Sequence, residues 1–451
     1  MKNKTPFFLG FALLFAGTQI SAKDLLSTYE LAKKNDPTLL KSQAEKQEFE
    51  SKIGVSKGLL LPQLDFDATY NHISCSDDSS ASDVLCSPPD RQSVSNAELE
   101  LTQALYQPST WRDWKLAQLK YQAKNATYLV RKQNLIIRVT RAYFKVLNNT
   151  YILEQRLAEI DAFKSSFDLA EQQFKVGLVP ITNVSQSKAK YLDALGKKAQ
   201  AESELQKSLE ELGILTGYRD RQLSPLNLKK FKTYPIPKKL DFYISDAKKY
   251  NLSILADRIK VQEAKKEISV KSAGALPSVN LTANYSLNHN KSNNDAQPYT
   301  DINNQYSYNG RENSIQIETN VPIYQGGQIS SAVEASKFNY VKFSQDFIKT
   351  YRQVITETKQ NYNNINDAIY NVQAYADTYK ANESVYKEKL AKYKVGTETM
   401  NNVLQSISDL YDSKRILQEK RLDYLLESLK LKKSQGTLSD RDLIQVSKLF
   451  E

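Results

Sequence analysis

The chain has few of the residues that interrupt regular structure. Its 451 residues include 14 glycines and 13 prolines, while tyrosine is abundant with 27 copies. Long helices with few breakers fit this composition better than a compact enzyme does. Histidine occurs twice, at His72 and His289, without a nucleophile elbow, a phosphate loop or a metal-spaced cluster. These scarcities argue against an enzyme, and we expect neither a cofactor nor a metal site.

Cysteine is nearly absent, with Cys75 and Cys86 as its two copies. Both lie in the polar segment 73–94, and in an exported protein such a small even number predicts a disulfide. The short loop would give a local stabilisation of ~2–3 kcal/mol in the chain-entropy model. A zinc site would need more ligands than His72, so we expect no metal there.

Long apolar runs are missing from the mature part of the chain. Near the N-terminus, Lys2 and Lys4 precede an apolar stretch, and Ser21 and Ala22 follow it. This order predicts a secretory signal peptide over 1–22. A retained anchor is the alternative, but the stretch is shorter than the ~20 residues of a membrane-spanning helix. We therefore expect export, and no later segment approaches a transmembrane helix.

No basic patch marks a nucleic-acid-binding surface. The formal net charge is +11, but lysine and arginine are scattered among acidic residues along the predicted helices. A nucleic-acid-binding protein would gather basic residues with aromatic stacking partners. Solvated helix faces explain the distribution better, and we expect no nucleic-acid partner.

Internal repetition is the most informative feature that the chain does have. Residues 29–71 return as 244–285, and FKVGLVPITNV returns as YKVGTETMNNV. The offset between matching residues stays between about 215 and about 219. This period is too long for a solenoid repeat and indicates duplication of a whole architectural unit. The expected domains are a first repeat over 23–240 and a second over 241–451.

Each repeat contains one very long predicted helix. Residues 109–176 and 326–395 contain no proline, and each helix would be roughly 100 Å long at 1.5 Å per residue. Apolar residues and tyrosines recur in both at the seven-residue pattern of supercoiled helices. Each long helix should end at a Val-Gly turn, because glycine readily adopts the left-handed conformation of a helix cap. Shorter helices are expected at about 24–60, 180–217, 240–275 and 399–435.

Four segments alternate apolar and polar residues with a period of two, which predicts β-strands. These segments are 63–72, about 97–105, 278–288 and about 314–323. Each has about 10 residues, the length of a membrane-crossing strand, and polar loops are expected at 73–94 and 288–313. A soluble sheet is the alternative, but the long helices leave no compact body for it to cover. Because open sheet edges are not tolerated in lipid, several copies of the chain should share one barrel.

Several segments resemble the TolC family of outer-membrane efflux proteins, over essentially the whole mature chain. They are LPQLDFDATY, TRAYFKVLN, FKVGLVPITNV, LPSVNLTANY, VPIYQGGQ and YKVGTETMNNVL. The resemblance implies an α+β membrane protein that forms a homotrimer. Each chain would add four strands to one twelve-stranded transmembrane β-barrel, continued by a twelve-helix periplasmic α-barrel. Residues 219–240 and 436–451 would lie in a mixed equatorial belt.

The resemblance also implies a function and a cellular setting. Such proteins are exit ducts of efflux pumps or type I secretion systems, and they conduct drugs, toxins or proteins. They work with an inner-membrane transporter and a periplasmic adaptor. We therefore expect this chain in the outer membrane, in contact with lipid, with a large periplasmic portion and no enzymatic activity. The alternative is a periplasmic coiled-coil scaffold or adaptor, although an adaptor would show one helical hairpin rather than a duplicated unit.

By resemblance, the closed end of the tunnel lies at the two Val-Gly turns. Tyr393 matches the gate tyrosine of the family, and Thr182 and Asn183 lie where the neighbouring helix supplies its partners. The same turns would dock the adaptor. The docking tips are expected at Val176, Gly177, Leu178, Val395, Gly396 and Thr397.

The expected aperture departs from the family pattern at three positions. Well-known members carry an arginine after the turn and two aspartates at the constriction, where this chain has Glu398, Asn402 and Gln405. Three copies of an aspartate pair would trap cations strongly, whereas amides carry no charge. We therefore expect weak cation selectivity and poor block by polyvalent cations, with a Glu398 ring as the substitute charge.

Overall fold

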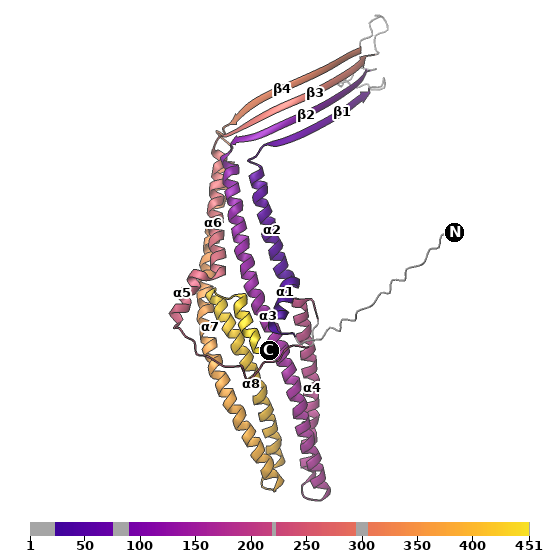
Figure 1. Ribbon diagram of the computed structural model, residues 1–451, viewed down its shortest axis with the longest axis vertical. Coiled ribbons are helices and arrows are strands. Elements are labelled where there is room, and N and C mark those ends of the chain that lie inside the picture. The colour runs from indigo at the N-terminus through magenta and orange to yellow at the C-terminus, as the bar shows by residue number, and fades with distance from the viewer. Residues whose placement is uncertain (1–22, 75–89, 219–221, 295–304, 451) are drawn as a thin grey trace, which may run out of the picture.

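The computed structural model describes residues 23–74, 90–218, 222–294 and 305–450. The predicted signal peptide, Cys75 and Cys86 lie outside these residues, so the disulfide stays a prediction. The described chain is elongated, with a layer of long helices and a four-stranded sheet at one end (Figure 1). Among the described helices, none is both long enough and apolar enough to cross a membrane.

Two long helices set the length of the molecule. Helix α3 spans Pro108–Lys175 with 68 residues, and α7 spans Gln328–Lys394 with 67 residues. Each is therefore roughly 100 Å long. Proline occupies the first turn of α3, where its missing N–H has no helical partner to lose. Both helices run from the sheet to the far end of the molecule (Figure 1).

Shorter helices run beside the lower halves of the long ones. Helix α4 spans Ile181–Thr216 and packs on α3, while α8 spans Met400–Gln435 and packs on α7. Helix α8 also packs on α3. The lower layer therefore has the order α4–α3–α8–α7, with α3 and α8 in its interior and α4 and α7 at its edges.

The segments 24–60 and 240–275, each predicted as a single helix, are divided in two. The four helices are α1 (Leu25–Asn35), α2 (Pro37–Gly58), α5 (Leu240–Tyr250) and α6 (Leu252–Ser272). The prediction was wrong because Asp36 and Asn251 cap the second helix of each pair. Their side-chain oxygens accept N–H bonds from the first turn, at 2.9 Å for Asp36 and at 2.9 and 3.2 Å for Asn251. Pro37 also removes the N–H that a continuous helix would need.

The C-terminal segment returns to the middle of the molecule. Helix α9 spans Asp440–Ser447 and is followed by the 3-10 turn η2 at Lys448–Phe450. The Phe450 ring lies 5.6 Å from the Tyr143 ring and 5.5 Å from the Phe144 ring of α3. These residues belong to a large hydrophobic cluster that joins α1, α3, α8 and α9. The middle of the molecule is therefore its most extensively packed region.

The strands form one antiparallel sheet in the order β1–β2–β3–β4. They span Gln63–Ser74, Asp90–Tyr106, Ser278–Asn294 and Gln305–Asn320. At 12, 17, 17 and 16 residues they extend into segments predicted as loops. The predicted lengths were wrong because the outer ends are polar on both faces, so they lose the alternation although the backbone ladder continues. His289 accordingly lies within β3 rather than in a loop.

Candidate functional site

Both long helices end in the same turn. Gly177 and Gly396 have φ of +76° and +78°, a left-handed conformation that glycine adopts without steric cost. The next residue, Leu178 or Thr397, donates its N–H to the carbonyl five positions back, at 2.8 and 3.0 Å. These are the outer bonds of a Schellman cap. The Val-Gly motif therefore ends each helix as its sequence predicts.

The two turns present apolar side chains to solvent. Val176, Leu178 and Val395 are 69, 73 and 73% exposed. Large apolar residues gathered at an exposed tip are typical of a surface that contacts another protein. The turns thus offer two similar apolar tips at the end of the molecule farthest from the sheet (Figure 1).

Tyr393 lies one turn before the second tip and is buried. Its hydroxyl donates to Gln173 Oε1 at 2.6 Å, which joins α7 to α3. Burial raises the pKa of Tyr393, and a hydrogen bond with the Asn183 side chain acts in the opposite direction. The structure thus brings Tyr393 and Asn183 together, while Thr182 is exposed. Gln173 was missed, although it directly precedes Phe174, the counterpart of Tyr393 in the first repeat.

A small hydrophobic core lies behind this contact. The first turns of α8 contribute Met400, Val403, Leu404 and Ile407, each at most 1% exposed. They pack with residues of α3, α4 and α7 in one cluster. Burial of these side chains holds the second hairpin, formed by α7 and α8, against the first.

Each residue predicted at the aperture is paired along its own segment. Glu398 Oε1 accepts hydrogen bonds from Asn402 Nδ2 at 2.7 Å and from the Thr399 N–H at 2.8 Å. These two bonds lower the pKa of Glu398, that from Asn402 most strongly. Gln405 Nε2 donates to Asp409 Oδ1 at 2.8 Å. Both amides are therefore held by carboxylates, and Asp409 is a charge that the sequence reading did not consider.

A buried ion cluster joins the two hairpins farther from the tips. Glu159 of α3 is 2% exposed, and its Oε2 lies 2.6 Å from Arg156 Nη1 and 3.2 Å from Arg415 Nη1 of α8. Burial lowers the pKa of Arg415, and Glu159 counteracts that shift. The expectation that helix charges are solvated was wrong here. Charge spacing along one helix does not reveal which charges a second helix will cover.

The register gives the sheet two unlike faces, because paired residues share a face and successive residues alternate. One face carries carboxylates on three of the four strands, β1, β2 and β4, while β3 contributes hydroxyl and amide side chains to it. The carboxylates are Asp65, Asp67, Glu98, Glu100, Glu312 and Glu318. The other face is apolar near the helices. Its members include Leu64, Phe66, Leu99, Leu101, Tyr285 and Ile315.

Comparison with known families identifies this architecture. The profile of the family described as outer membrane efflux protein matches residues 28–218 and 243–437. The chain belongs to that family. It is therefore an outer-membrane protein of a family of channels.

Individual relatives agree over nearly their whole lengths. Outer membrane protein TolC of Vibrio cholerae is 33% identical over 451 residues, covering 99% of this chain and 98% of that protein. The proteases secretion protein PrtF of Dickeya chrysanthemi is 21% identical and covers 100% and 96%. Among solved structures, the CmeC outer membrane channel of Campylobacter jejuni has a TM-score of 0.74 at 15% identity, covering 100% and 98%. The last likeness confirms the α+β channel fold.

Proposed function

We propose that this outer membrane efflux protein is a trimeric exit duct, gated at the tips of its helical hairpins. It would conduct small molecules or proteins outward from an inner-membrane transporter, through a periplasmic adaptor. The observation that carries the proposal is a two-faced sheet at the end of helices roughly 100 Å long. An apolar face suits lipid, and an acidic face suits a water-filled lumen.

The strand order supports assembly from several copies. β1 and β4 are the edges of the sheet, and in lipid every edge must find a partner. Pairing β4 of one copy with β1 of the next satisfies both edges. Three copies would contribute twelve strands to one closed barrel, as the resemblance implies.

The helical layer has open edges of its own. α7 lies at one edge and exposes Phe338, Val341, Tyr370 and Val385, which are 67, 50, 74 and 42% exposed in the single chain. A neighbouring copy would cover Phe338 and Val341 with its α2 edge, near the sheet, and Tyr370 and Val385 with its α4 edge, nearer the tips. The same arrangement that closes the barrel would therefore close a helical tunnel beneath it.

The gate would operate by moving the second hairpin against the first. The Tyr393–Gln173 bond and the Glu159–Arg415 ion pair both join these hairpins. Opening would require the tip bond to break, while the buried ion pair would keep the hairpins together nearer the middle. The exposed apolar tips would receive the adaptor.

The relatives of this chain point to two classes of substrate. One relative is a TolC protein and another a protease secretion protein, so we propose that this duct serves both drug efflux and type I secretion. We assign it no catalytic step, cofactor or metal. The duct would be passive, with energy supplied by the transporter.

Deletion of the gene tests the proposed function. We expect the deletion strain to become drug-sensitive and to lose secreted proteins, and the wild-type gene to restore both. The protein should be extracted from outer membranes as a heat-modifiable trimer. A soluble periplasmic pool without a membrane trimer would favour the scaffold alternative instead.

The amides at the aperture give a second test. We expect polyvalent cations added from the periplasmic side to block single channels weakly, because Asn402 and Gln405 carry no charge. The Asn402→Asp/Gln405→Asp variant should gain tight block, since it adds six carboxylates to a trimer. Tight block of the wild-type channel would contradict the proposed weak cation selectivity.

A further inference from the structure

The apolar face of the sheet becomes polar and basic toward its outer end. Rows of paired residues cross the strands, and the register orders them from the helices outward. The rows are Leu64–Leu101–Ala283–Ile315, Phe66–Leu99–Tyr285–Asn313, Ala68–Ala97–Leu287–Arg311, Tyr70–Ser95–His289–Asn309 and His72–Ser93–Lys291–Ser307. Arg311 begins the change, and Lys291 continues it two rows farther out.

The position of this change matches the thickness of a membrane. Val279 and Leu287 bound the apolar part of β3 on this face, and they are ~26 Å apart along the strand at about 3.3 Å per residue. Barrel strands are tilted by ~40°, so this length covers about 20 Å of an apolar band that is ~25 Å tall. Arg311, which pairs with Leu287, therefore lies within about 5 Å of the outer boundary, where its long side chain can reach the lipid head groups.

Two hollows lie on this face, one on each side of the change. The inner hollow has a volume of ≈ 440 Å³, and its lining includes Leu64, Leu99, Tyr285 and Ile315. The outer hollow has a volume of ≈ 760 Å³. Its lining includes Ala68, Tyr70, Ala97, Leu287, His289 and Arg311. Small side chains at Ala68 and Ala97 leave this space open.

The charges beside the outer hollow have one sign. Arg311 and Lys291 are exposed, and neither forms an ion pair with a carboxylate among the described residues. The carboxylates of the strands lie on the opposite face. His289 Nδ1 contacts Asn309 Oδ1, which orients that ring beside the hollow. An anionic group would meet uncompensated positive charge here.

We propose that the two hollows form one binding site for a phosphate-bearing lipid of the outer leaflet. The acyl chains lie over the inner hollow, and the phosphate binds Arg311 and Lys291. Arginine offers a planar pair of donors that matches phosphate oxygens, and Tyr70 lies at the boundary, where its polar tip and apolar ring suit a membrane interface. The inference rests on the proposed trimer in the outer membrane and adds a specific lipid to it.

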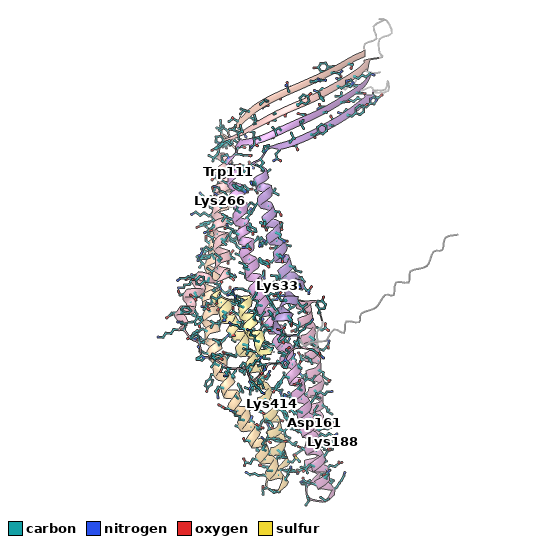
Figure 2. The ribbon with its side chains drawn as sticks, viewed as in Figure 1. Lys33, Trp111, Asp161, Lys188, Lys266 and Lys414 are labelled. Atoms are coloured by element: carbon teal, nitrogen blue, oxygen red, sulfur yellow. The ribbon has the colours of Figure 1, made fainter. Side chains whose placement is uncertain are left out.

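Native mass spectrometry of the full-length trimer in detergent tests the site. The probe is a hexa-acylated, bisphosphorylated glycolipid, compared with the same glycolipid after removal of its phosphates. Arg311→Gln/Lys291→Gln should bind the phosphorylated probe roughly 25-fold more weakly, at about fivefold per charge. The matched control is Lys188→Gln/Lys41→Gln, on α4 and α2, which should bind like the wild type. Lys188 lies in the lower part of the molecule, far from the sheet (Figure 2).

Three results would overturn the lipid site. They are equal binding of the phosphorylated probe by the double variant and the wild type, equal binding of both glycolipids by the wild type, and full displacement of the lipid by inorganic phosphate. The last result would indicate a site for free anions. The mass of the lipid-free wild-type protein tests the proposed trimer separately from the lipid site. A chain that forms no trimer would contradict the proposed function before any lipid is added.

Discussion

The two helical hairpins, α3–α4 and α7–α8, have the same kind of turn but differ at the start of their return helices, α4 and α8. Gly177 and Gly396 have nearly the same backbone conformation. Yet Ile181, which opens α4, is 54% exposed, whereas its counterpart Met400, which opens α8, is 1% exposed. Helix α8 lies between α3 and α7, while α4 lies at an edge. Duplication thus copied the turn, and position in the layer decided what the turn is packed against.

A second difference lies one turn before each tip. Phe174 of the first hairpin is 41% exposed, while its counterpart Tyr393 is 5% exposed and bonds to Gln173. Tyr393 carries a hydroxyl that Phe174 lacks, and it is buried between the hairpins. The second hairpin therefore makes a polar contact with the first. This contrast supports the proposal that the Tyr393–Gln173 contact of the second hairpin is the latch that holds the gate closed.

Breaking the buried ion cluster should have the largest effect. Glu159→Gln removes the buried carboxylate shared by Arg156 and Arg415, so that Arg415 keeps, among the described residues, only its contact with the exposed Asp412. We expect a loss of roughly 3–5 kcal/mol of stability. Thermal unfolding of the purified protein, followed by helical circular dichroism, measures this loss. The matched control is Glu211→Gln, which removes an exposed ion pair with Lys145 between α3 and α4. That change should cost about 0–1 kcal/mol, and equal shifts would contradict the assigned role of burial.

Truncating the first residue of α8 should have the next largest effect on stability. Met400→Ala should cost roughly 2–5 kcal/mol, because it leaves a cavity in the core behind the second tip. Ile181→Ala should change the stability of a single hairpin little, since Ile181 is largely exposed. Comparing the unfolding midpoints of the two variants measures how differently the first residues of α4 and α8 are packed. Comparable losses would indicate that a neighbouring copy buries Ile181 as deeply as α3 buries Met400.

Substituting the glycine of either turn should lower the stability by equal amounts, which are smaller than the losses above. Gly177→Ala and Gly396→Ala each place a side chain in the left-handed region, at a cost of about 1–2 kcal/mol. Gly196→Ala, inside α4 and with open space around it, should instead be neutral or stabilising by up to about 1 kcal/mol. Thermal unfolding of the three variants checks this order. Unequal losses at the two turns would show that their likeness is limited to the backbone.

The sequence predicts most of what depends on local pattern. Long helices follow from the absence of proline, and the turns at Gly177 and Gly396 follow from glycine chemistry. The break at Asp36 was predictable in principle, because Asp-Pro marks a helix start, whereas the break at Asn251 carries a weaker signal. The burial of Glu159 depends on which helix packs over it, and no pattern within α3 reveals that.

In the sheet and the aperture, too, local pattern predicts some features, while contacts between distant segments decide the others. Alternation located the inner halves of the strands, but backbone pairing continues through polar residues that alternation cannot detect. The resemblance selected Tyr393, yet its acceptor Gln173 lies 220 positions away in sequence. Contacts at that separation come from the fold as a whole.

The most direct test of the account is the single-channel conductance of Tyr393→Phe. Wild-type channels should be mostly closed, and loss of the bond to Gln173, worth about 1 kcal/mol, should raise the open fraction roughly fivefold. The reciprocal control Phe174→Tyr should leave the open fraction unchanged. A Tyr393→Phe channel as closed as the wild type, or a Phe174→Tyr channel altered as much as Tyr393→Phe, would contradict the assignment of the latch to the second hairpin.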